Sequence, residues 1–223
     1  MTDAATSADP QDAARRTLAE HRSRQLLEAA ARLMEREGSE AVSMQALAKE
    51  AGVSVGLIYR YFGSKDDILL AVITDVLDAF ASEVPTAVEQ AGDDPVRRLA
   101  AAFAAYCRVI DTHRHAAVLT YRESKSLDEA GRTRIKQLEV ETSEPLRAAI
   151  HDGVRAGKLI ADDPDLVAYN LLLLAHAWAL KHWYFEQTKT LDAYIGGQVA
   201  LALRAILAKG REREYGDLLA HSS

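Results

Sequence analysis

The stretch VSVGLIYRYFGSKDDIL, residues 53–69, decides the fold. Ser54 is a suitable N-cap, because a serine side chain can accept a hydrogen bond from a free N–H of the first helical turn, and it predicts a short helix through Tyr61. Ser64 is a cap of the same kind for a longer helix with apolar residues on one face. The short helix carries a Tyr-Arg-Tyr run, which helices that only fill a core do not usually have.

Another short helix precedes this one in the sequence. Ser43 predicts its start, and Gly52 predicts its end because glycine readily adopts the left-handed conformation that closes a helix. Two short helices separated by a turn of a few residues form a helix-turn-helix unit. A periodic apolar pattern over residues 22–37 predicts a helix before both. We therefore expect a three-helix helix-turn-helix domain over residues 21–66.

The rest of the chain also has helical periodicity, with no sustained strand alternation. The segment VPTAVEQAGDDP is interpreted as a break, and Pro145 is expected to kink or divide the helix that contains it. The fold class is therefore all-α. Helices are predicted near residues 64–80, 96–111, 115–123, 127–156, 165–187 and 191–208. The expected domains are a disordered tail at 1–20, the helix-turn-helix domain, a helical ligand-binding and dimerisation domain at 67–210, and a C-terminal tail at 211–223.

Composition bounds the class of protein. The chain has 223 residues and a net charge of −6, which argues against coating nucleic acid by charge alone. Residues 13–65 nevertheless carry nine Lys/Arg against six Asp/Glu, whereas the remainder is acidic. The lone Cys107 excludes an internal disulfide and fits a reducing cytosol. The N-terminus lacks the apolar core of a signal peptide, and no apolar run is long enough for a membrane span. We expect a cytoplasmic protein without a membrane partner.

The helix from Ser54 to Tyr61 has the side chains that a DNA major groove requires. Arg60 can offer its planar guanidinium to a guanine edge, and aliphatic side chains can touch a thymine methyl group. Gly56 permits close approach of a groove wall, while tyrosine hydroxyls and Lys65 are suitable phosphate partners. The alternative is that the tyrosines are half-buried packing residues and Lys65 is a solvated surface charge. The whole constellation on the second helix of a helix-turn-helix favours DNA reading.

Residues 22–70 resemble the TetR/AcrR family of bacterial transcription regulators, on the segments AARLMEREG and VSMQALAKEAGVSVGLIYRYFGSKDDIL and the closing Tyr-Phe-x-x-Lys sequence. Met44 departs from the family, in which many members have threonine. The resemblance implies a homodimeric repressor that binds a palindromic operator and has a small-molecule pocket in each subunit. It places base-facing residues at Gln45, Val55, Gly56, Leu57 and Arg60. It places backbone-contacting residues at Ser43, Ser54, Tyr59, Tyr61 and Lys65.

The predicted helix over residues 192–208 suits dimerisation. It is lined by small residues, and two adjacent glycines inside a helix each cost about 1 kcal/mol relative to alanine. Close approach of another helix is the usual reason to keep them. The interface candidates are Gly196, Gly197 and Ala200, with packing inside the chain as the alternative.

Polar and aromatic residues within the apolar helices are the candidates for ligand binding, because ligand sites are mostly apolar with a few convergent polar groups. The histidine spacings do not suit a metal site, and no cofactor is expected. The candidate ligand-binding residues are Tyr106, Tyr121, Arg122, His176, Trp178 and Lys181.

The segments YRESKSL and WALKHWYF are similar to parts of TetR-type regulators of fatty-acid, sterol and other acyl-CoA catabolism. This resemblance implies an acyl-CoA thioester or related hydrophobic acid as effector. An aromatic or drug-like inducer, as in regulators of efflux, is the alternative. A helical ligand-binding protein that does not contact DNA is a further one. The sequence has no Ser/Cys-His-acid motif, phosphate loop or metal-ligand spacing, and therefore none of the usual signs of an enzyme.

Overall fold

The computed structural model describes residues 10–123 and 127–220, with side chains from Arg22 onward. This part of the chain consists of helices joined by loops and contains no β-strand, which confirms the all-α class. It divides into two compact units between Val72 and Ile73, six residues beyond the expected domain boundary.

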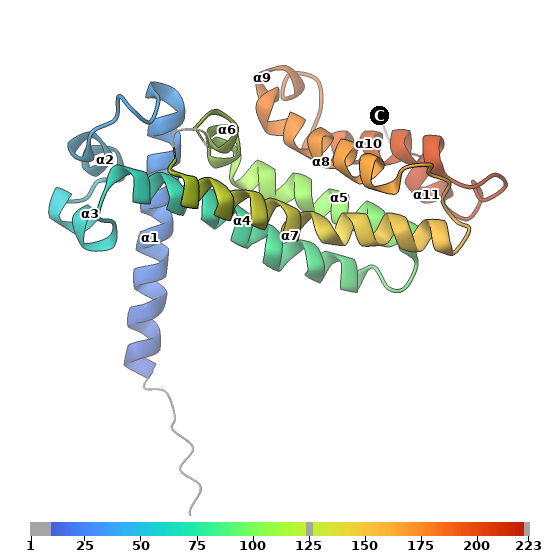
Figure 1. The fold of residues 1–223 in the computed structure, drawn as a ribbon, viewed down its shortest axis with the longest axis horizontal. Coiled ribbons are helices and arrows are strands. Elements are labelled where there is room, and N and C mark those ends of the chain that lie inside the picture. Colours follow the sequence, from blue (N-terminus) through green and yellow to red (C-terminus); the bar gives the residue numbers. More distant parts are fainter. Residues whose placement is uncertain (1–9, 124–126, 221–223) are drawn as a thin grey trace, which may run out of the picture. The chain divides into compact units, whose positions relative to one another are not determined.

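The first unit contains α1 (Pro10–Glu37), α2 (Met44–Ala51), α3 (Val55–Tyr61) and the start of α4 (Lys65–Gln90). Within it, α2 packs against α1, and α3 packs against α2 (Figure 1). Helix α1 begins at Pro10 rather than at the expected Arg22, so residues 10–20 are helical and the expected tail was drawn too long. Proline is well accepted in a first helical turn, and good helix formers follow it. Residues 1–9 lie outside the described residues.

The caps that define the two short helices are confirmed. The Ser43 Oγ accepts a hydrogen bond from the Ala46 N–H at 3.1 Å, and the Ser54 Oγ accepts one from the Leu57 N–H at 3.2 Å. Gly52 ends α2 with φ of 67°, in the left-handed region that a side chain would disfavour. Local sequence chemistry thus sets both ends of the turn that joins α2 to α3.

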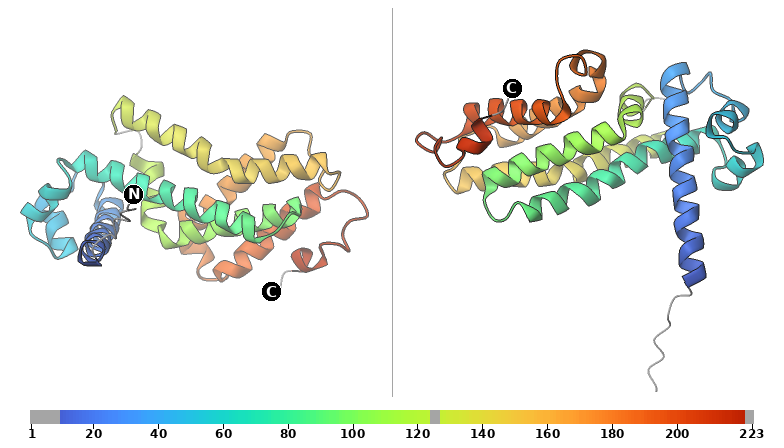
Figure 2. Two further views of the ribbon diagram at one scale, coloured as in Figure 1. Left: turned by 90° about the horizontal axis from the view of Figure 1, so that it is seen from below. Right: turned by 180° about the vertical axis from the view of Figure 1, so that it is seen from behind.

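The second unit is a bundle around one central helix, α5 (Pro95–Thr112), which contacts α7, α8 and α10 (Figure 2). Helix α5 is buried along its length: Phe103 and Tyr106 are at most 1% exposed, and Cys107 is fully buried. No helix in the described residues combines the length and apolar character needed to cross a membrane. The surrounding helices are α6 (Arg114–Glu123), α7 (Glu129–Arg155), α8 (Pro164–Leu180) and α10 (Leu191–Ile206), together with α4 from Ile73 onward.

Two prolines interrupt helices less than expected. Helix α4 continues through Pro85 to Gln90, where the sequence predicted a break. Val84 is fully buried on the same turn, so packing holds the helix together despite the lost hydrogen bond. Helix α7 likewise runs through Pro145 without being divided.

The helix predicted over residues 165–187 ends early, at Leu180, and a separate short helix, α9 (His182–Phe185), follows. An aromatic cluster accounts for the break. The Phe185 ring stacks on Trp178 with centroids 6.1 Å apart and lies 4.8 Å from the Tyr194 ring of α10. A straight continuation of α8 would carry Phe185 away from these partners.

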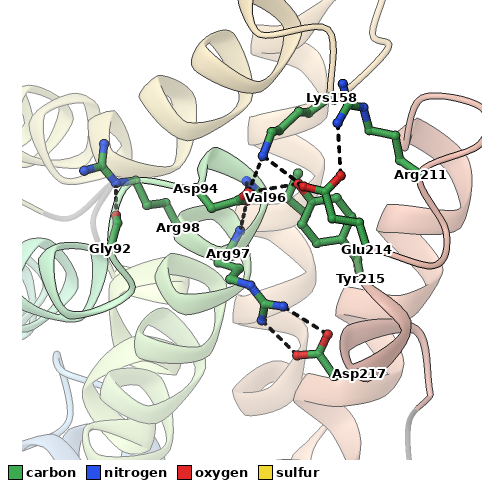
Figure 3. A network of polar contacts seen from close by, with 10 residues as sticks. All are labelled: Gly92, Asp94, Val96, Arg97, Arg98, Lys158, Arg211, Glu214, Tyr215 and Asp217. Carbon is green, nitrogen blue, oxygen red and sulfur yellow. Dashed lines mark hydrogen bonds and ion pairs between the residues drawn. The ribbon is translucent and has the colours of Figure 1, made fainter.

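The C-terminal segment is part of the fold rather than a tail. Short helix α11 (Gly216–Leu219) packs against α10, and Tyr215 before it is fully buried. The Tyr215 hydroxyl donates a hydrogen bond to Asp94 at 2.9 Å, and Lys158 forms an ion pair with the same carboxylate (Figure 3). Arg97 pairs with Asp217 at 2.8 Å. These contacts correct the prediction of a tail over residues 211–220; residues 221–223 lie outside the described residues.

Asp94 links three parts of the second unit. Its Oδ1 caps α5 by accepting hydrogen bonds from the N–H groups of Val96 and Arg97, at 2.9 and 3.1 Å. Burial by itself would raise the pKa of Asp94, but the Lys158 ammonium, the Arg97 N–H and the Tyr215 hydroxyl outweigh it and hold the pKa below its ordinary value of 3.8. The charged form of Asp94 therefore stabilises the folded state.

We expect Asp94→Asn to lower the free energy of unfolding at pH 7 by about 1 kcal/mol, because asparagine preserves the helix cap but loses the charge-assisted bonds. A depressed folded-state pKa contributes stability above the unfolded-state pKa and loses it as the pH falls through the folded value. The difference between the variant and the parent should therefore shrink below about pH 4. Urea unfolding followed by circular dichroism at pH 7 and pH 3 measures it. Asp93→Asn, at an exposed neighbour that pairs with Arg98, is the matched control. Equal losses in the free energy of unfolding for both variants would contradict the stabilising role of the Asp94 charge.

Candidate functional site

Helix α3 has one anchored side and one open side. Ile58 is fully buried and holds the helix against the first unit, whereas Phe62 at the helix end is only partly buried. Tyr59 is 55% exposed and Arg60 is exposed next to it. The Arg60 guanidinium carbon lies 5.7 Å from the centroid of the Tyr61 ring, so the ring helps to hold the cation at the surface.

The first turn of α3 leaves room for a close partner. A Cβ built on Gly56 would meet no other atom within 4 Å, so this position faces open space. Val55 and Leu57 on either side are half-buried, and their remaining surface is apolar. The open side therefore combines an approachable backbone, small apolar contacts and one arginine, which are the groups that read base edges in a major groove.

Polar groups flank this surface. Ser43, Gln45 and Ser54 are exposed at the starts of α2 and α3. The Ser43 and Ser54 hydroxyl oxygens already accept backbone N–H bonds, which leaves each hydroxyl proton free to be donated outward. The Lys65 Nζ donates to the Glu40 carbonyl oxygen at 2.9 Å and so ties α4 to the loop before α2, an interaction that the sequence did not reveal.

A cavity of about 660 Å³ lies in the second unit, enclosed by residues of α4, α5, α6, α7 and α8. Its walls are mostly aliphatic and aromatic. Three of the six predicted ligand residues, Tyr106, Tyr121 and His176, line it. Its size and lining are those of a small-molecule site.

The other three predicted ligand residues do not line this cavity. Trp178 is 3% exposed and donates its indole N–H to Asp111 at 2.8 Å, so it is a structural member of the aromatic cluster. Lys181 is the C-cap of α8, and Arg122 is exposed at the end of α6. Basic and aromatic residues on these helices were good candidates by type, but their helix faces point elsewhere.

Helix α7 contributes residues to the cavity that were not predicted from the sequence. Lys136 and Glu139 lie at its opening, with Thr142 one turn further along. Desolvation raises the pKa of the Glu139 carboxyl, and the nearby Lys136 opposes the shift only in part. The i, i+3 spacing of these two charges on an otherwise amphipathic helix was the available signal, although it is also typical of a solvated helix face.

The three predicted interface residues of α10 differ in their surroundings. Ala200 is fully buried within the chain and has no surface left for a second copy, which corrects its assignment. Gly196 lines a groove shared with α5 and α11. Gly197 is open, since a Cβ there would meet no atom within 4 Å, and Leu201 one turn later is 61% exposed. Gly197 and Leu201 therefore form the exposed apolar strip of α10.

In the part of the chain that the structure describes, no three His, Cys, Asp or Glu side chains are grouped so as to hold a metal ion. The polar groups of the cavity are instead hydroxyls, one imidazole, one ammonium and one carboxylate. This set of groups suits binding through hydrogen bonds and apolar contact.

Comparisons with known proteins match both the helix-turn-helix unit and the helical unit that contains the cavity. The family described as "Bacterial regulatory proteins, tetR family" matches residues 26–72, and that described as "Tetracyclin repressor-like, C-terminal domain" matches residues 92–207. The transcriptional regulator HbdR of Aromatoleum sp. (strain CIB) is 39% identical over 195 residues, which are 87% of this chain and 85% of HbdR.

Solved structures give the same result for the fold. The TetR-family regulator PfmR of Thermus thermophilus matches with a TM-score of 0.72 at 27% identity, covering 80% of this chain and 97% of PfmR. AibR, solved in complex with isovaleryl coenzyme A and operator DNA, matches with a TM-score of 0.70 at 23% identity, covering 81% of this chain and 97% of AibR. Regulators of this family bind operator DNA, function as dimers and respond to small-molecule effectors. The chain belongs to the TetR family and is a transcriptional regulator that binds DNA, not an enzyme.

Proposed function

We propose that this regulator is a repressor that binds a palindromic operator as a homodimer and leaves it when an apolar effector enters the cavity of each subunit. The observation that carries the proposal is the continuity of α4. This helix begins at Lys65, four residues after the end of α3 at Tyr61. It also supplies four cavity-lining side chains, Ile73, Val76, Leu77 and Phe80. A ligand that displaces these side chains acts on the helix to which the DNA-reading helix is joined.

The effector must discriminate between two conformations for this mechanism to work. A ligand that bound the DNA-competent and DNA-released conformations equally would shift no population, however tight its binding. The cavity residues on α4 provide a route to such discrimination, because a ligand in the cavity contacts this helix directly and can favour one position of it over another.

We further propose an acyl-CoA thioester as the effector. The apolar walls suit an acyl group, and Lys136 at the opening offers a cation near which the CoA phosphates can lie. AibR, which shares the fold, was solved with isovaleryl coenzyme A. Glu139 at the same opening favours the second candidate, an uncharged or cationic aromatic compound, because a carboxylate repels phosphates.

Arg60→Ala should weaken binding to the operator by about 1–3 kcal/mol and relax the preference at one base pair per half-site, because a bidentate contact to a base edge is lost. Lys65→Ala should weaken binding to all sequences and lower the salt slope by about one, because it removes a phosphate contact. Electrophoretic shift assays on specific and nonspecific DNA at several salt concentrations measure both. Arg213→Ala, at an exposed position of the second unit, is the control. The same effect of Arg60→Ala on both DNAs would contradict base reading.

Gly197→Leu and Leu201→Glu should convert the dimer to a monomer and abolish high-affinity operator binding. The protomer has space at Gly197, and Leu201 is largely exposed, so losses at these positions would arise from a second copy. Sedimentation at micromolar concentration and operator shift assays measure the two effects. Ile160→Glu, at a 57% exposed apolar residue between α7 and α8 that does not line the cavity, is the matched control. The palindrome should present half-sites about 34–36 Å apart, or more if the DNA is untwisted or two dimers bind. A monomeric parent protein, or dimers that survive both changes, would refute the arrangement.

A panel of acyl-CoAs, free acids and aromatic compounds tests the effector class. We expect at least one acyl-CoA to raise the melting temperature and to release the operator, and Lys136→Gln to weaken its binding several-fold by removing the cation at the opening. Binding of the matching free acid should change less, because it lacks the CoA phosphates. Thermal-shift screening followed by the DNA shift assay measures this. If only a neutral or cationic compound both stabilises the protein and releases DNA, the thioester is wrong and the aromatic candidate replaces it.

A further inference from the structure

The cavity has an inner end and an open end that differ in chemistry. At the open side, Val140 is 65% exposed and Tyr169 is 57% exposed. At the inner end, Phe80 is 3% exposed and Tyr106 is fully buried. A ligand that fills the cavity must therefore place its leading part against Phe80 and Tyr106.

Two polar atoms at the inner end have no partner. The Tyr106 hydroxyl and the His176 Nδ1 are buried and make no hydrogen bond with the described residues. Their rings lie on the same aromatic wall, with centroids 4.9 Å and 6.2 Å from that of Phe80. An unpaired buried polar group costs about 1–3 kcal/mol, so two of them on one wall of a cavity indicate a missing partner.

Neighbouring hydroxyls do not supply that partner. The Thr120 hydroxyl donates to the Ala116 carbonyl at 2.8 Å, within its own helix. The Thr142 hydroxyl donates to the Glu139 carbonyl at 3.3 Å and opposes part of the rise that burial causes in the pKa of Tyr106, but it does not meet hydrogen-bond geometry with the Tyr106 hydroxyl. Tyr194, a buried tyrosine outside the cavity, is bonded as usual, with its hydroxyl donating to the Leu174 carbonyl at 2.6 Å. Buried polar atoms without a partner also occur outside the cavity, at His182 Nδ1 and Gln198 Oε1, but Tyr106 and His176 are the pair that shares the cavity wall.

The inner end is also uncharged. Burial lowers the pKa of His176 to about 4, so the imidazole is neutral at pH 7. Among the described residues that line the cavity, Lys136 and Glu139 carry the formal charges, and both belong to α7 at the opening. A carboxylate at the inner end would lose its hydration without gaining a counter-charge, which is strongly unfavourable. An uncharged oxygen would lose far less.

We propose that the inner end of the cavity binds an uncharged oxygen of the effector, a carbonyl or a hydroxyl, between the Tyr106 hydroxyl and the His176 Nδ1. A carbonyl oxygen can accept from both groups, and a hydroxyl can donate to one and accept from the other, because imidazole exists in two tautomers. The effector is thus an apolar molecule with a neutral polar group on its leading part. This inference rests on the proposed function, since it takes the cavity as the effector site.

Four naphthalene probes of similar size test the inference on the full-length protein without DNA: 2-acetylnaphthalene, 2-naphthalenemethanol, 2-ethylnaphthalene and 2-naphthoate. We expect the ketone or the alcohol to bind at least about fivefold more tightly than 2-ethylnaphthalene, because one net hydrogen bond is gained. We expect 2-naphthoate at pH 7 to bind at least about tenfold more weakly than the better of these two. The ranking of ketone and alcohol identifies the oxygen. Isothermal titration calorimetry gives all four dissociation constants.

Tyr106→Phe removes the hydroxyl and keeps the ring against Phe80. We expect it to reduce the preference for the oxygenated probe over 2-ethylnaphthalene several-fold while the affinity for 2-ethylnaphthalene itself stays unchanged. That unchanged affinity reports an intact cavity. Tyr194→Phe, at a buried tyrosine outside the cavity, is the matched control and should leave the preference as in the parent protein.

Three results would overturn the inference: naphthoate binding as tightly as the ketone, no binding by any probe, or an unaltered preference in Tyr106→Phe. The last would leave the two groups as partners of trapped water only. Failure of the proposed function is distinguishable, because operator binding and release are measured separately with DNA. A protein that prefers the neutral oxygen but never releases an operator would keep this site and lose its assigned regulatory role.

Discussion

Burial of α5 is the constraint on which the second unit depends. Because this helix is covered along its length, its buried side chains are enclosed by α7, α8 and α10, which pack against it. Protein interiors pack at crystal-like density, so a cavity of about 660 Å³ beside such a helix is an exception. The cavity lies beside the contact between the Phe80 and Tyr106 rings, whose centroids are 4.9 Å apart. A bundle with an unfilled region of this size has room for the effector that we propose.

The helix-turn-helix was predictable because local chemistry determines it. Ser43, Gly52 and Ser54 act within four residues of their own positions, so the sequence alone placed both short helices correctly. Longer-range packing decided the elements that were misplaced. Burial of Val84 carries α4 past Pro85, and the aromatic cluster around Trp178 turns the chain at the end of α8. Both effects depend on tertiary contacts, which the hydrophobic periodicity of a single segment does not reveal.

The cavity was only partly predictable for the same reason. Its walls come from five helices, and a residue lines it because of the rotation of its helix rather than its type. Tyr106, Tyr121 and His176, predicted as ligand-binding residues from their polarity within apolar segments, do line the cavity, and their role in ligand binding stays a prediction. Trp178 had the same signal, yet Asp111 holds its indole on another face. In sequence, Lys136 has the pattern of a solvated lysine and Tyr215 lies in a segment predicted as a tail. Only the tertiary structure places Lys136 at the cavity and Tyr215 in the core.

The burial of Cys107 has a practical consequence. The thiol is fully enclosed, and burial raises its pKa to about 12, so the reactive thiolate is essentially absent at neutral pH. As the sole cysteine of the chain, it leaves the surface free of reactive sulfur. We therefore expect slow reaction of the folded protein with maleimides and other thiol-directed reagents. A cysteine introduced near α3 would be the single labelled position in each subunit, and paired spin labels there would report the separation of the two reading helices with an unmodified core.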